Sequence, residues 1–322
     1  MNPVAFNLFG IEIMWYAVLI MFGVILGLIV AKFNTSRKEL NLSFDDFLDA
    51  FLYAFPLAIV GARLYYVFFE WNQYKDDLIQ ILNVRGGGLA IHGGLIGAVF
   101  GVLLYKVIHH KTTAYMLSLG DAAAPGLILA QGVGRWGNFV NREAHGGPVT
   151  LEFIAKFPKF IQEGMFINGT YYHPTFLYES LWNFSMFIVL LVIFWRRKKH
   201  HQGTVLAWYM ILYSLGRFFI EGLRTDSLYA GGLRTAQLVS ILMATAGALY
   251  LIYKYTRKPP VEAVVIAYTD AKAEVAMDDA PKDLPPNTDI SEASKEVSDV
   301  DQSEQASSVT TTPVENEHSS PK

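Results

Sequence analysis

Residues 13–33 read IMWYAVLIMFGVILGLIVAKF, and the only charged side chain among them is Lys32. A helix needs about 20 predominantly apolar residues to cross the hydrocarbon core of a bilayer. This stretch therefore predicts a membrane-spanning helix. We expect no cleavable signal peptide, because the run is long enough to span and no basic segment precedes it.

Six more stretches are long and apolar enough to span a bilayer. They are residues 47–69, 88–108, 117–138, 175–195, 203–223 and 235–255. The whole chain is 52% hydrophobic and only 17% charged, whereas soluble proteins average about 25% charged residues. The sequence therefore predicts an all-α, polytopic membrane protein with seven transmembrane helices.

Lysine and arginine gather in alternate connections between these stretches. The basic connections are residues 32–38, 106–111, 196–201 and 254–258. Because short loops rich in Lys and Arg stay in the cytoplasm, we expect the N-terminus outside and the C-terminus in the cytoplasm. The longest outer connection, about 139–174, is predicted to form a small extracytoplasmic head. Its segment 151–161 fits either an element at the membrane surface or an ordinary folded loop.

The last part of the chain differs in charge from the rest. Residues 261–322 carry 14 Asp/Glu and 4 Lys, a net charge of −10, while residues 1–260 carry a net charge of +7. Polar, charged segments of this kind bury too little apolar surface to fold. We therefore predict a seven-helix transmembrane domain over 1–258 and a disordered, acidic cytoplasmic tail over 259–322. The chain has no cysteine, which excludes disulfides, thiolate metal sites and a cysteine nucleophile.

Charged residues inside membrane spans are costly and usually mark function, although a structural ion pair is the competing explanation. The stretch 203–223 and its end carry Tyr213, Arg217, Glu221 and Arg224, at spacings of 4, 4 and 3 residues. Such spacings place the four side chains on one face of a continuous helix. Because this helix is predicted to run from the cytoplasmic side outward, the stripe climbs toward the outer surface.

Five other predicted spans place polar side chains at about the same outer depth. They are Tyr16 in the first span, Arg63 and Glu70 in the second, His92 in the third, Arg135 and Asn138 in the fourth, and His173, Tyr178 and Glu179 in the fifth. Asp121 is an exception, because it lies 14 residues before Arg135, or about 21 Å along a helix. We expect Asp121 to have a structural, hydrogen-bonding role near the cytoplasmic end.

Several arginines beside a histidine and carboxylates indicate a site for an anionic amphiphile in the outer leaflet. Because a guanidinium donates two parallel hydrogen bonds to phosphate, Arg135, Arg217 and Arg224 are candidates to hold a lipid headgroup and a departing phosphate. His92 is the candidate general base, and a carboxylate such as Glu221 would orient an arginine or act as the base instead. No H-E-x-x-H or G-x-S-x-G motif occurs, so neither a zinc protease nor a hydrolase elbow is expected.

The longest motif is Gly134-Arg-Trp-Gly-Asn-Phe-Val-Asn-Arg-Glu-Ala-His-Gly146. It resembles the pattern G-R-x-G-N-F-x-N-x-E-x-x-G of the prolipoprotein diacylglyceryl transferase family at every fixed position. Shorter matches follow the family's order within residues 1–255, at 61–64, 92–97, 121–125, 173–179 and 213–224. The acidic tail departs from the family pattern and leaves the resemblance of the core intact.

The resemblance implies a reaction that needs no cofactor and no metal. The sn-1,2-diacylglyceryl group of phosphatidylglycerol passes to the lipobox cysteine thiol of a prolipoprotein, forms a thioether and releases glycerol phosphate. The implied partners are phosphatidylglycerol, membrane lipid, and preprolipoprotein signal peptides with a lipobox Cys, with no nucleic acid. The implied location is the bacterial plasma membrane, as a multi-pass protein whose catalytic domain is the transmembrane domain.

Together, the resemblance and the polar pattern define a candidate site. The candidate catalytic residues are His92, Arg135, Tyr213 and Arg217. The candidate substrate-binding residues are Tyr16, Arg63, Asn138, Glu143, Gly146, Glu221 and Arg224. Two roles fit His92: it deprotonates the thiol, or it binds the headgroup while the arginines lower the pKa of the thiol electrostatically.

Two other functions are compatible with the polar pattern. One is a transporter for an anionic solute, in which the arginines line a pathway, and the other is a non-catalytic lipid-binding scaffold. Transporters often show internal repeats and a site near the midplane of the membrane. This sequence has no apparent repeat, and its polar side chains gather toward one leaflet. The sequence therefore favours the transferase.

Overall fold

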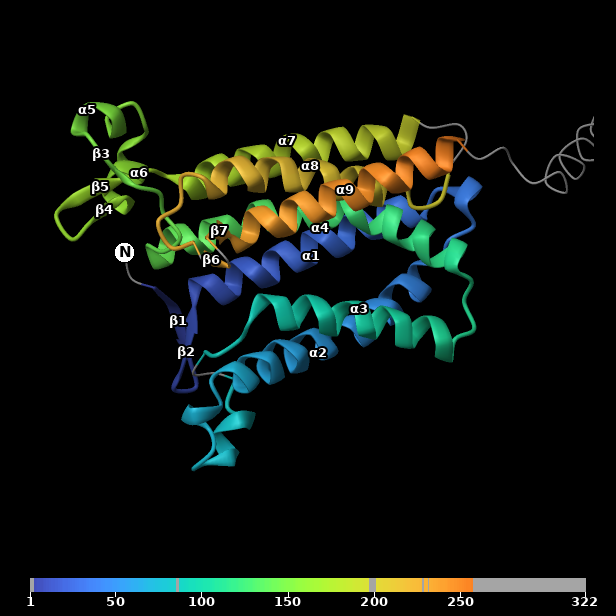
Figure 1. Ribbon diagram of the computed structural model, residues 1–322, viewed down its shortest axis with the longest axis horizontal. Helices are drawn as coiled ribbons and strands as arrows, with labels where there is room; N and C mark the ends of the chain where they lie inside the picture. Colours follow the sequence, from blue (N-terminus) through green and yellow to red (C-terminus); the bar gives the residue numbers. More distant parts are fainter. Residues whose placement is uncertain (1–2, 85–86, 197–200, 228, 231, 257–322) are drawn as a thin grey trace, which may run out of the picture. The chain divides into compact units, whose positions relative to one another are not determined.

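The structure is a computed structural model, and it describes residues 3–84, 87–196, 201–227, 229–230 and 232–256 (Figure 1). Two sequence predictions lie outside these residues. They are the disorder of the tail over 259–322 and most of the basic connection 196–201.

Seven long helices dominate the described residues. They are α1 (Trp15–Thr35), α2 (Phe44–Phe69), α3 (Ile91–Ile108), α4 (Thr113–Asn141), α7 (Thr175–Arg196), α8 (Thr204–Glu221) and α9 (Thr235–Thr256). All except α8 are long and apolar enough to cross a membrane, which confirms the prediction of a helical, polytopic membrane protein. Helix α8 corresponds to the predicted span 203–223, and Arg217 and Glu221 lower its mean hydropathy.

The ends of two helices follow directly from side-chain hydrogen bonds. Thr112 Oγ1 accepts a hydrogen bond from the backbone N–H of Tyr115 at 3.2 Å and so caps the N-terminus of α4. The N-terminus of α8 is capped from α4, because the buried carboxylate of Asp121 accepts from the N–H of Gly203 at 2.7 Å and of Leu206 at 2.8 Å. Such acceptors satisfy backbone N–H groups that have no partner within the helix. Asp121 thus has the structural, hydrogen-bonding role that the sequence predicts.

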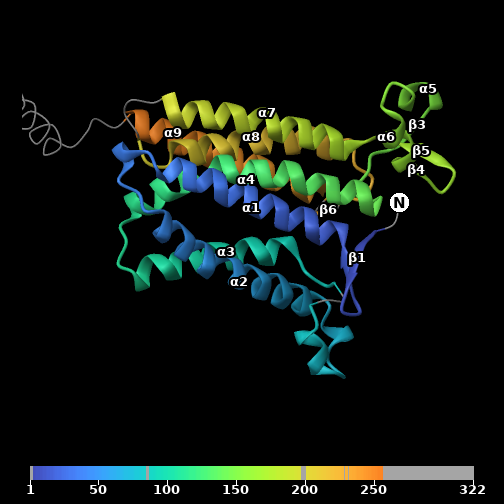
Figure 2. The same ribbon diagram turned by 180° about the vertical axis from the view of Figure 1, so that it is seen from behind.

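Helices α2 and α3 form an antiparallel hairpin beside the other helices (Figures 1 and 2). Glycine makes this close packing possible, because the helix backbones meet where no side chain intervenes. A Cβ atom added to Gly97 would lie 2.1 Å from the carbonyl oxygen of Leu57, and one added to Gly101 would lie 2.6 Å from the Cα of Ala54. The hairpin is therefore a tightly packed unit.

The remaining long helices pack around α4. Helix α1 lies along one side of α4, where a Cβ on Gly126 would come within 2.7 Å of the carbonyl oxygen of Gly27. Helices α7 and α8 also contact α4, and α9 packs against α8. The shared core consists of Ala122, Ala124, Ile128, Leu190, Phe194 and Val205.

The predicted head is a small folded unit between α4 and α7. It contains β3 (Pro148–Val149), α5 (Leu151–Ile154), α6 (Lys159–Gly164), β4 (Phe166–Ile167) and β5 (Thr170–Tyr172). The strands form an antiparallel sheet in the order β3-β5-β4. Ile154, Ile161 and Met165 pack with Phe139 and Phe176 in a buried core. Segment 151–161 is thus folded and contributes side chains to this core.

The small elements gather at the two ends of the helices. The hairpin of β1 (Val4–Leu8) and β2 (Ile11–Met14) lies at the same end as the head, as do β6 (Tyr229–Ala230) and β7 (Leu233–Arg234) (Figure 1). Two short 3-10 helices, η2 (Trp71–Gln73) and η3 (Leu78–Leu82), follow α2 at this end. The short helix η1 (Lys38–Leu40) and the α3–α4 connection lie at the opposite end. The head end is thus the end where α2, α4 and α8 finish and α3 and α7 begin.

Candidate functional site

Charged side chains from three helices and one loop meet at the head end of the structure. We call this group the arginine–carboxylate cluster, and it consists of Arg135, Glu179, Arg217, Glu221, Arg224 and Asp226. Arg135 comes from α4, Glu179 from α7, and Arg217 and Glu221 from α8, while the last two residues follow α8. The three arginines that the sequence predicts to act together are therefore brought together.

Glu179 lies at the centre of the cluster. Its Oε2 lies 2.7 Å from Nε of Arg135, and its Oε1 lies 3.0 Å from Nη1 of Arg217 and 3.6 Å from Nη1 of Arg224. The Glu179 side chain is buried, so its charge is compensated by these arginines rather than by water. One carboxylate of α7 thus holds guanidinium groups from α4 and α8 at a common point.

Glu221 supports the same arginines from the last residue of α8. Its Oε2 lies 2.6 Å from Nη2 of Arg217 and 3.9 Å from Nε of Arg224. The guanidinium group of Arg234, in β7, donates a hydrogen bond to the backbone carbonyl oxygen of Glu221. Because buried carbonyl groups at helix ends need such donors, Arg234 holds the end of α8 in place.

Arg224 differs from the prediction in one respect. The sequence places it on one helical face with Tyr213, Arg217 and Glu221, but α8 ends at Glu221 and Gly222 forms the C-cap. The prediction of a single continuous face is therefore wrong for Arg224. The backbone N–H of Arg224 donates to the carbonyl oxygen of Glu221 at 3.2 Å, and this tight turn keeps the guanidinium group within the cluster.

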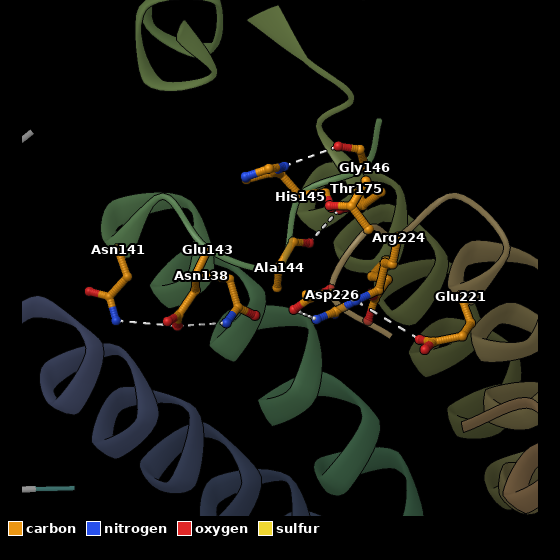
Figure 3. Close-up of polar contacts among 12 residues, drawn as sticks. Asn138, Asn141, Glu143, Ala144, His145, Gly146, Thr175, Glu221, Arg224 and Asp226 are labelled. Carbon is orange, nitrogen blue, oxygen red and sulfur yellow. Dashed lines mark hydrogen bonds and ion pairs between the residues drawn. The ribbon is translucent and has the colours of Figure 1, made fainter. Parts of the chain in front are cut away.

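Asp226 completes the cluster and was not predicted from the sequence. Its two carboxylate oxygens accept from Nε of Arg224 at 2.9 Å and from Nη2 at 2.7 Å, a bidentate pair drawn in Figure 3. Burial alone would raise the pKa of Asp226, but the hydrogen bonds and the charge of Arg224 outweigh burial and lower this pKa. Burial alone would lower the pKa of the Arg224 guanidinium group. The hydrogen bonds and charge of Asp226, together with the charges of Glu179 and Glu221, outweigh burial and raise this pKa.

Gly146, which lies between α4 and β3, pairs with the backbone of Arg224. Gly146 and Arg224 form an isolated antiparallel bridge, and the N–H of Gly146 donates to the carbonyl oxygen of His173 at 3.0 Å. A Cβ at position 146 would lie 2.6 Å from Cβ of His173 and 3.0 Å from the carbonyl oxygen of Leu223. Only glycine fits between these two strands of chain, which gives the predicted site residue Gly146 a steric reason.

Asn138 and Glu143 extend the cluster along the end of α4. Asn138 Nδ2 donates to Oε1 of Glu143 at 3.0 Å, and Asn141 Nδ2 donates to the same oxygen at 3.3 Å (Figure 3). Asn138 Oδ1 in turn accepts from Nη1 of Arg135 at 3.4 Å. The chain reverses here because Arg142 adopts a left-handed conformation with φ 55°. The motif 134–146 is therefore a helix end that folds back on itself.

Tyr16 packs against this helix end from α1. A Cβ on Gly137 would lie only 2.6 Å from the Tyr16 ring, so glycine at 137 makes room for the ring. Tyr16 therefore borders the α4 segment that carries Arg135 and Asn138.

Three predicted site residues lie apart from the cluster contacts. Tyr213 stacks on Tyr209, with ring centroids 5.8 Å apart, one helical turn before Arg217. His92 is exposed at the start of α3, and its ring centroid lies 6.1 Å from that of Tyr65 in α2. His92 therefore belongs to the α2–α3 hairpin, whereas the arginines of the cluster lie in α4, in α8 and in the loop after α8.

The third of these residues, Arg63, is buried, and within the described part of the chain its hydrogen bonds go to backbone carbonyl oxygens. Its guanidinium group donates hydrogen bonds of 2.6–3.0 Å to the carbonyl oxygens of Gln80, Ile81, Gly87 and Gly88. It also lies 4.9 Å from the centroid of the Tyr74 ring. This geometry indicates a role in holding the α2–α3 connection rather than in binding a headgroup.

Comparison with known proteins identifies the family. The family model described as prolipoprotein diacylglyceryl transferase matches residues 3–253. A phosphatidylglycerol–prolipoprotein diacylglyceryl transferase of Clostridium botulinum (strain Langeland) is 54% identical over 258 residues, covering 80% of this chain and 98% of that protein. The similarly named proteins of Clostridium kluyveri and Clostridium perfringens (strain 13) are 53% and 51% identical, covering 79% and 80% of this chain and 96% of each protein. The chain therefore belongs to the prolipoprotein diacylglyceryl transferase family.

Proposed function

We propose that this membrane enzyme transfers the sn-1,2-diacylglyceryl group of phosphatidylglycerol to the lipobox cysteine thiol of a prolipoprotein. The observation that carries the proposal is the convergence of Arg135, Arg217 and Arg224 on buried carboxylates at one end of the helices. The names of the related clostridial transferases supply the donor and the acceptor class. Family membership also argues against the transporter and the scaffold as alternatives.

The reaction needs a site that holds a phosphodiester while one of its C–O bonds breaks. The thiol sulfur attacks the sn-3 carbon of the diacylglyceryl group, a C–S bond forms, and the bond from this carbon to the phosphate oxygen breaks. The electron pair and the negative charge pass to the glycerol phosphate. In the proposed mechanism Arg135 and Arg217 stabilise this developing charge, because guanidinium groups that are already oriented need no rearrangement when the charge appears. The end of α4 that carries Arg135 is held in position by four other candidate residues, Tyr16, Asn138, Glu143 and Gly146.

His92 is the proposed acceptor of the thiol proton. It is exposed on the α2–α3 hairpin, so a peptide thiol can reach it from outside the cluster. A thiol with a pKa near 8.5 needs only modest help to ionise near neutral pH. In the proposal, Tyr213 lies one turn deeper than Arg217 and borders the diacylglyceryl portion of the donor.

The proposed arrangement in the membrane follows from the charges at the two ends. We propose that all seven long helices, including α8, cross a bacterial plasma membrane, with the N-terminus and the head outside and the C-terminus in the cytoplasm. Five lysines lie at or near the helix ends opposite the head: Lys32, Lys38, Lys106, Lys111 and Lys254. The positive-inside rule assigns that side to the cytoplasm. The cluster then lies at the outer leaflet, where the phosphatidylglycerol headgroup and an exported lipobox Cys meet.

A turnover assay tests the function directly. Purified full-length protein is incubated with phosphatidylglycerol and a lipobox peptide, and the peptide is analysed by mass spectrometry. We expect a mass gain of one diacylglyceryl group on the Cys, and none on a Cys→Ser peptide or with Arg135→Ala. The matched control is Glu163→Gln, an exposed acid of α6 in the head, which we expect to behave as the wild type. Absence of the mass gain from folded wild-type protein contradicts the proposal.

The pH dependence of His92→Ala separates the two roles of this residue. If His92 accepts the thiol proton, the variant is nearly inactive near neutral pH and recovers as the pH rises through the thiol pKa of about 8.5. If His92 binds the headgroup instead, the variant shows a raised KM for phosphatidylglycerol and no recovery at high pH. The second pattern contradicts the assignment as base and leaves the transfer reaction in place.

A further inference from the structure

The anion-binding fork of Arg224 is already occupied. Asp226 places one carboxylate oxygen on Nε and the other on Nη2, at 2.9 and 2.7 Å (Figure 3). This is the geometry with which a guanidinium group binds two oxygens of a phosphate. A headgroup phosphate that approaches Arg224 therefore meets a carboxylate in the place where its own oxygens would bind.

The cluster as described is also electrically balanced. Its three guanidinium groups, Arg135, Arg217 and Arg224, pair with the three carboxylates of Glu179, Glu221 and Asp226. Adding a phosphodiester, which carries one negative charge, would give a largely buried site an excess negative charge. Uncompensated charge in such a site is costly, so binding is favourable only if one carboxylate leaves.

The exposure of the three carboxylates decides which of them leaves. The side chains of Glu179 and Glu221 are 5% and 3% exposed and belong to helices, whereas the side chain of Asp226 is 49% exposed and belongs to a loop. Asp226 can turn into water by a change of side-chain rotamer, which costs little. The backbone beside it stays fixed, because the N–H of Thr225 donates to the carbonyl oxygen of His145 at 3.4 Å.

We propose that Asp226 occupies the phosphate position on Arg224 in the empty site and is displaced by the anionic headgroup. The exchange replaces one negative charge by another, so the cluster stays balanced with and without the lipid. When the glycerol phosphate departs, the carboxylate of Asp226 returns to Arg224 and competes with rebinding. The inference rests on the proposed function, because it takes the phosphodiester donor as the ligand.

The proposal predicts a gain of affinity when the competing charge is removed. Asp226→Asn keeps the size of the side chain but not its charge, so glycerol phosphate binds without displacing a carboxylate. We expect about tenfold tighter binding, which corresponds to about 1.4 kcal/mol. Asp226→Glu keeps the charge, and we expect its affinity to stay within about threefold of the wild type. A purely structural role for Asp226 would not produce tighter binding.

The experiment measures binding of glycerol phosphate to the purified full-length protein by isothermal titration calorimetry. The variants are Asp226→Asn, Asp226→Glu and the control Glu163→Gln, which removes the same charge from an exposed site in the head. Thermal unfolding of each variant checks that it is folded. The same proteins are then assayed for product inhibition by glycerol phosphate during transfer to the lipobox peptide.

The outcomes separate this inference from the proposed function. Tighter binding in Asp226→Asn, with Asp226→Glu and Glu163→Gln near the wild type, supports the displacement, and stronger product inhibition follows from it. Equal or weaker binding in folded Asp226→Asn overturns the inference, even if transfer is normal. An equal gain in Glu163→Gln also overturns it, because the effect is then one of net charge. Absence of transfer by the wild-type protein contradicts the proposed function. The calorimetric affinities for glycerol phosphate still show whether Asp226 competes with the anion.

Discussion

Glu179→Gln tests whether one carboxylate organises the arginines. The substitution keeps the shape of the side chain and removes the charge that Arg135, Arg217 and Arg224 share at 2.7, 3.0 and 3.6 Å. Arg217 retains Glu221 at 2.6 Å, and Arg224 retains Asp226 at 2.7 Å. Arg135 has Asn138 as its remaining hydrogen-bond partner in the described contacts. The substitution therefore affects Arg135 most.

The expected magnitude follows from these contacts. At an effective dielectric constant of about 20, opposite charges 3 Å apart attract by roughly 5.5 kcal/mol, and desolvation offsets much of this attraction. Removing one partner of a buried ion pair costs about 3–5 kcal/mol. Because the Arg135 side chain is 21% exposed, solvent screens part of the loss, and we expect a fall of about 2–3 kcal/mol in the free energy of unfolding. This corresponds to a decrease in Tm of roughly 3–6 °C for a chain of this size.

Activity should fall further than stability alone explains. A displaced guanidinium group no longer faces the departing phosphate, and a misplacement of about 1 Å can cost on the order of a hundredfold in rate. We expect the kcat of folded Glu179→Gln to fall by about this factor, measured by mass spectrometry of the lipobox peptide below the Tm of the variant. Glu163→Gln serves as the control for the loss of one carboxylate at this end of the protein.

A double-mutant cycle identifies the partner. If Arg135 and Glu179 stabilise each other, the double variant Arg135→Gln, Glu179→Gln loses less stability than the sum of the single variants, by about 1–2 kcal/mol. Additive effects, or a Glu179→Gln protein with the Tm and kcat of the wild type, would refute the reasoning that Glu179 organises the cluster.

Three further predictions address the guanidinium group of Arg135, the packing of the α2–α3 hairpin, and Asp121, which caps α8. Arg135→Lys keeps the charge but loses the planar fork, so we expect the transfer rate to fall by roughly tenfold or more with little change in Tm; an unchanged rate would show that charge alone suffices. Gly97→Ala would place a Cβ 2.1 Å from the carbonyl oxygen of Leu57, whereas the Cβ of Gly94→Ala would meet nothing closer than 3.6 Å. Thermal unfolding should therefore show a fall of about 1–3 kcal/mol in the free energy of unfolding for Gly97→Ala and none for Gly94→Ala. Asp121→Leu leaves the N-terminus of α8 without its buried acceptor, and we expect a loss of about 1–2 kcal/mol in unfolding free energy, measured by thermal unfolding, with the KM for phosphatidylglycerol unchanged.

Much of the fold can be predicted from the sequence because each span carries its own signal. The apolar runs predicted at 13–33 and 235–255 correspond closely to α1 (Trp15–Thr35) and α9 (Thr235–Thr256). The interior of the head could not be predicted in the same way. Its strands have two or three residues each, and the core beside them combines Ile154, Ile161 and Met165 of the head with Phe139 of α4 and Phe176 of α7. Such long-range packing leaves no periodic pattern in a short stretch.

Part of the candidate site could also be predicted from the sequence, because charged residues are conspicuous inside apolar spans. Arg135, Arg217 and Glu221 stand out as charges inside apolar spans, and the structure brings them together. Glu179 gives the same signal, but a single acid in a span does not reveal that three arginines surround it. Asp226 gives no signal, because an acidic residue in a loop is ordinary until its partner Arg224 is known.

The contacts of Arg63 determine how His92 can move. Arg63 belongs to α2 and binds carbonyl oxygens on the chain that leads into α3, and the N–H of Ala90 donates to the carbonyl oxygen of Ala62 at 3.0 Å. The start of α3 is therefore fastened to α2 just before His92. His92 therefore keeps its position relative to α2 only as long as these hydrogen bonds hold, and the close packing at Gly97 and Gly101 fixes the rest of α3 against the same helix.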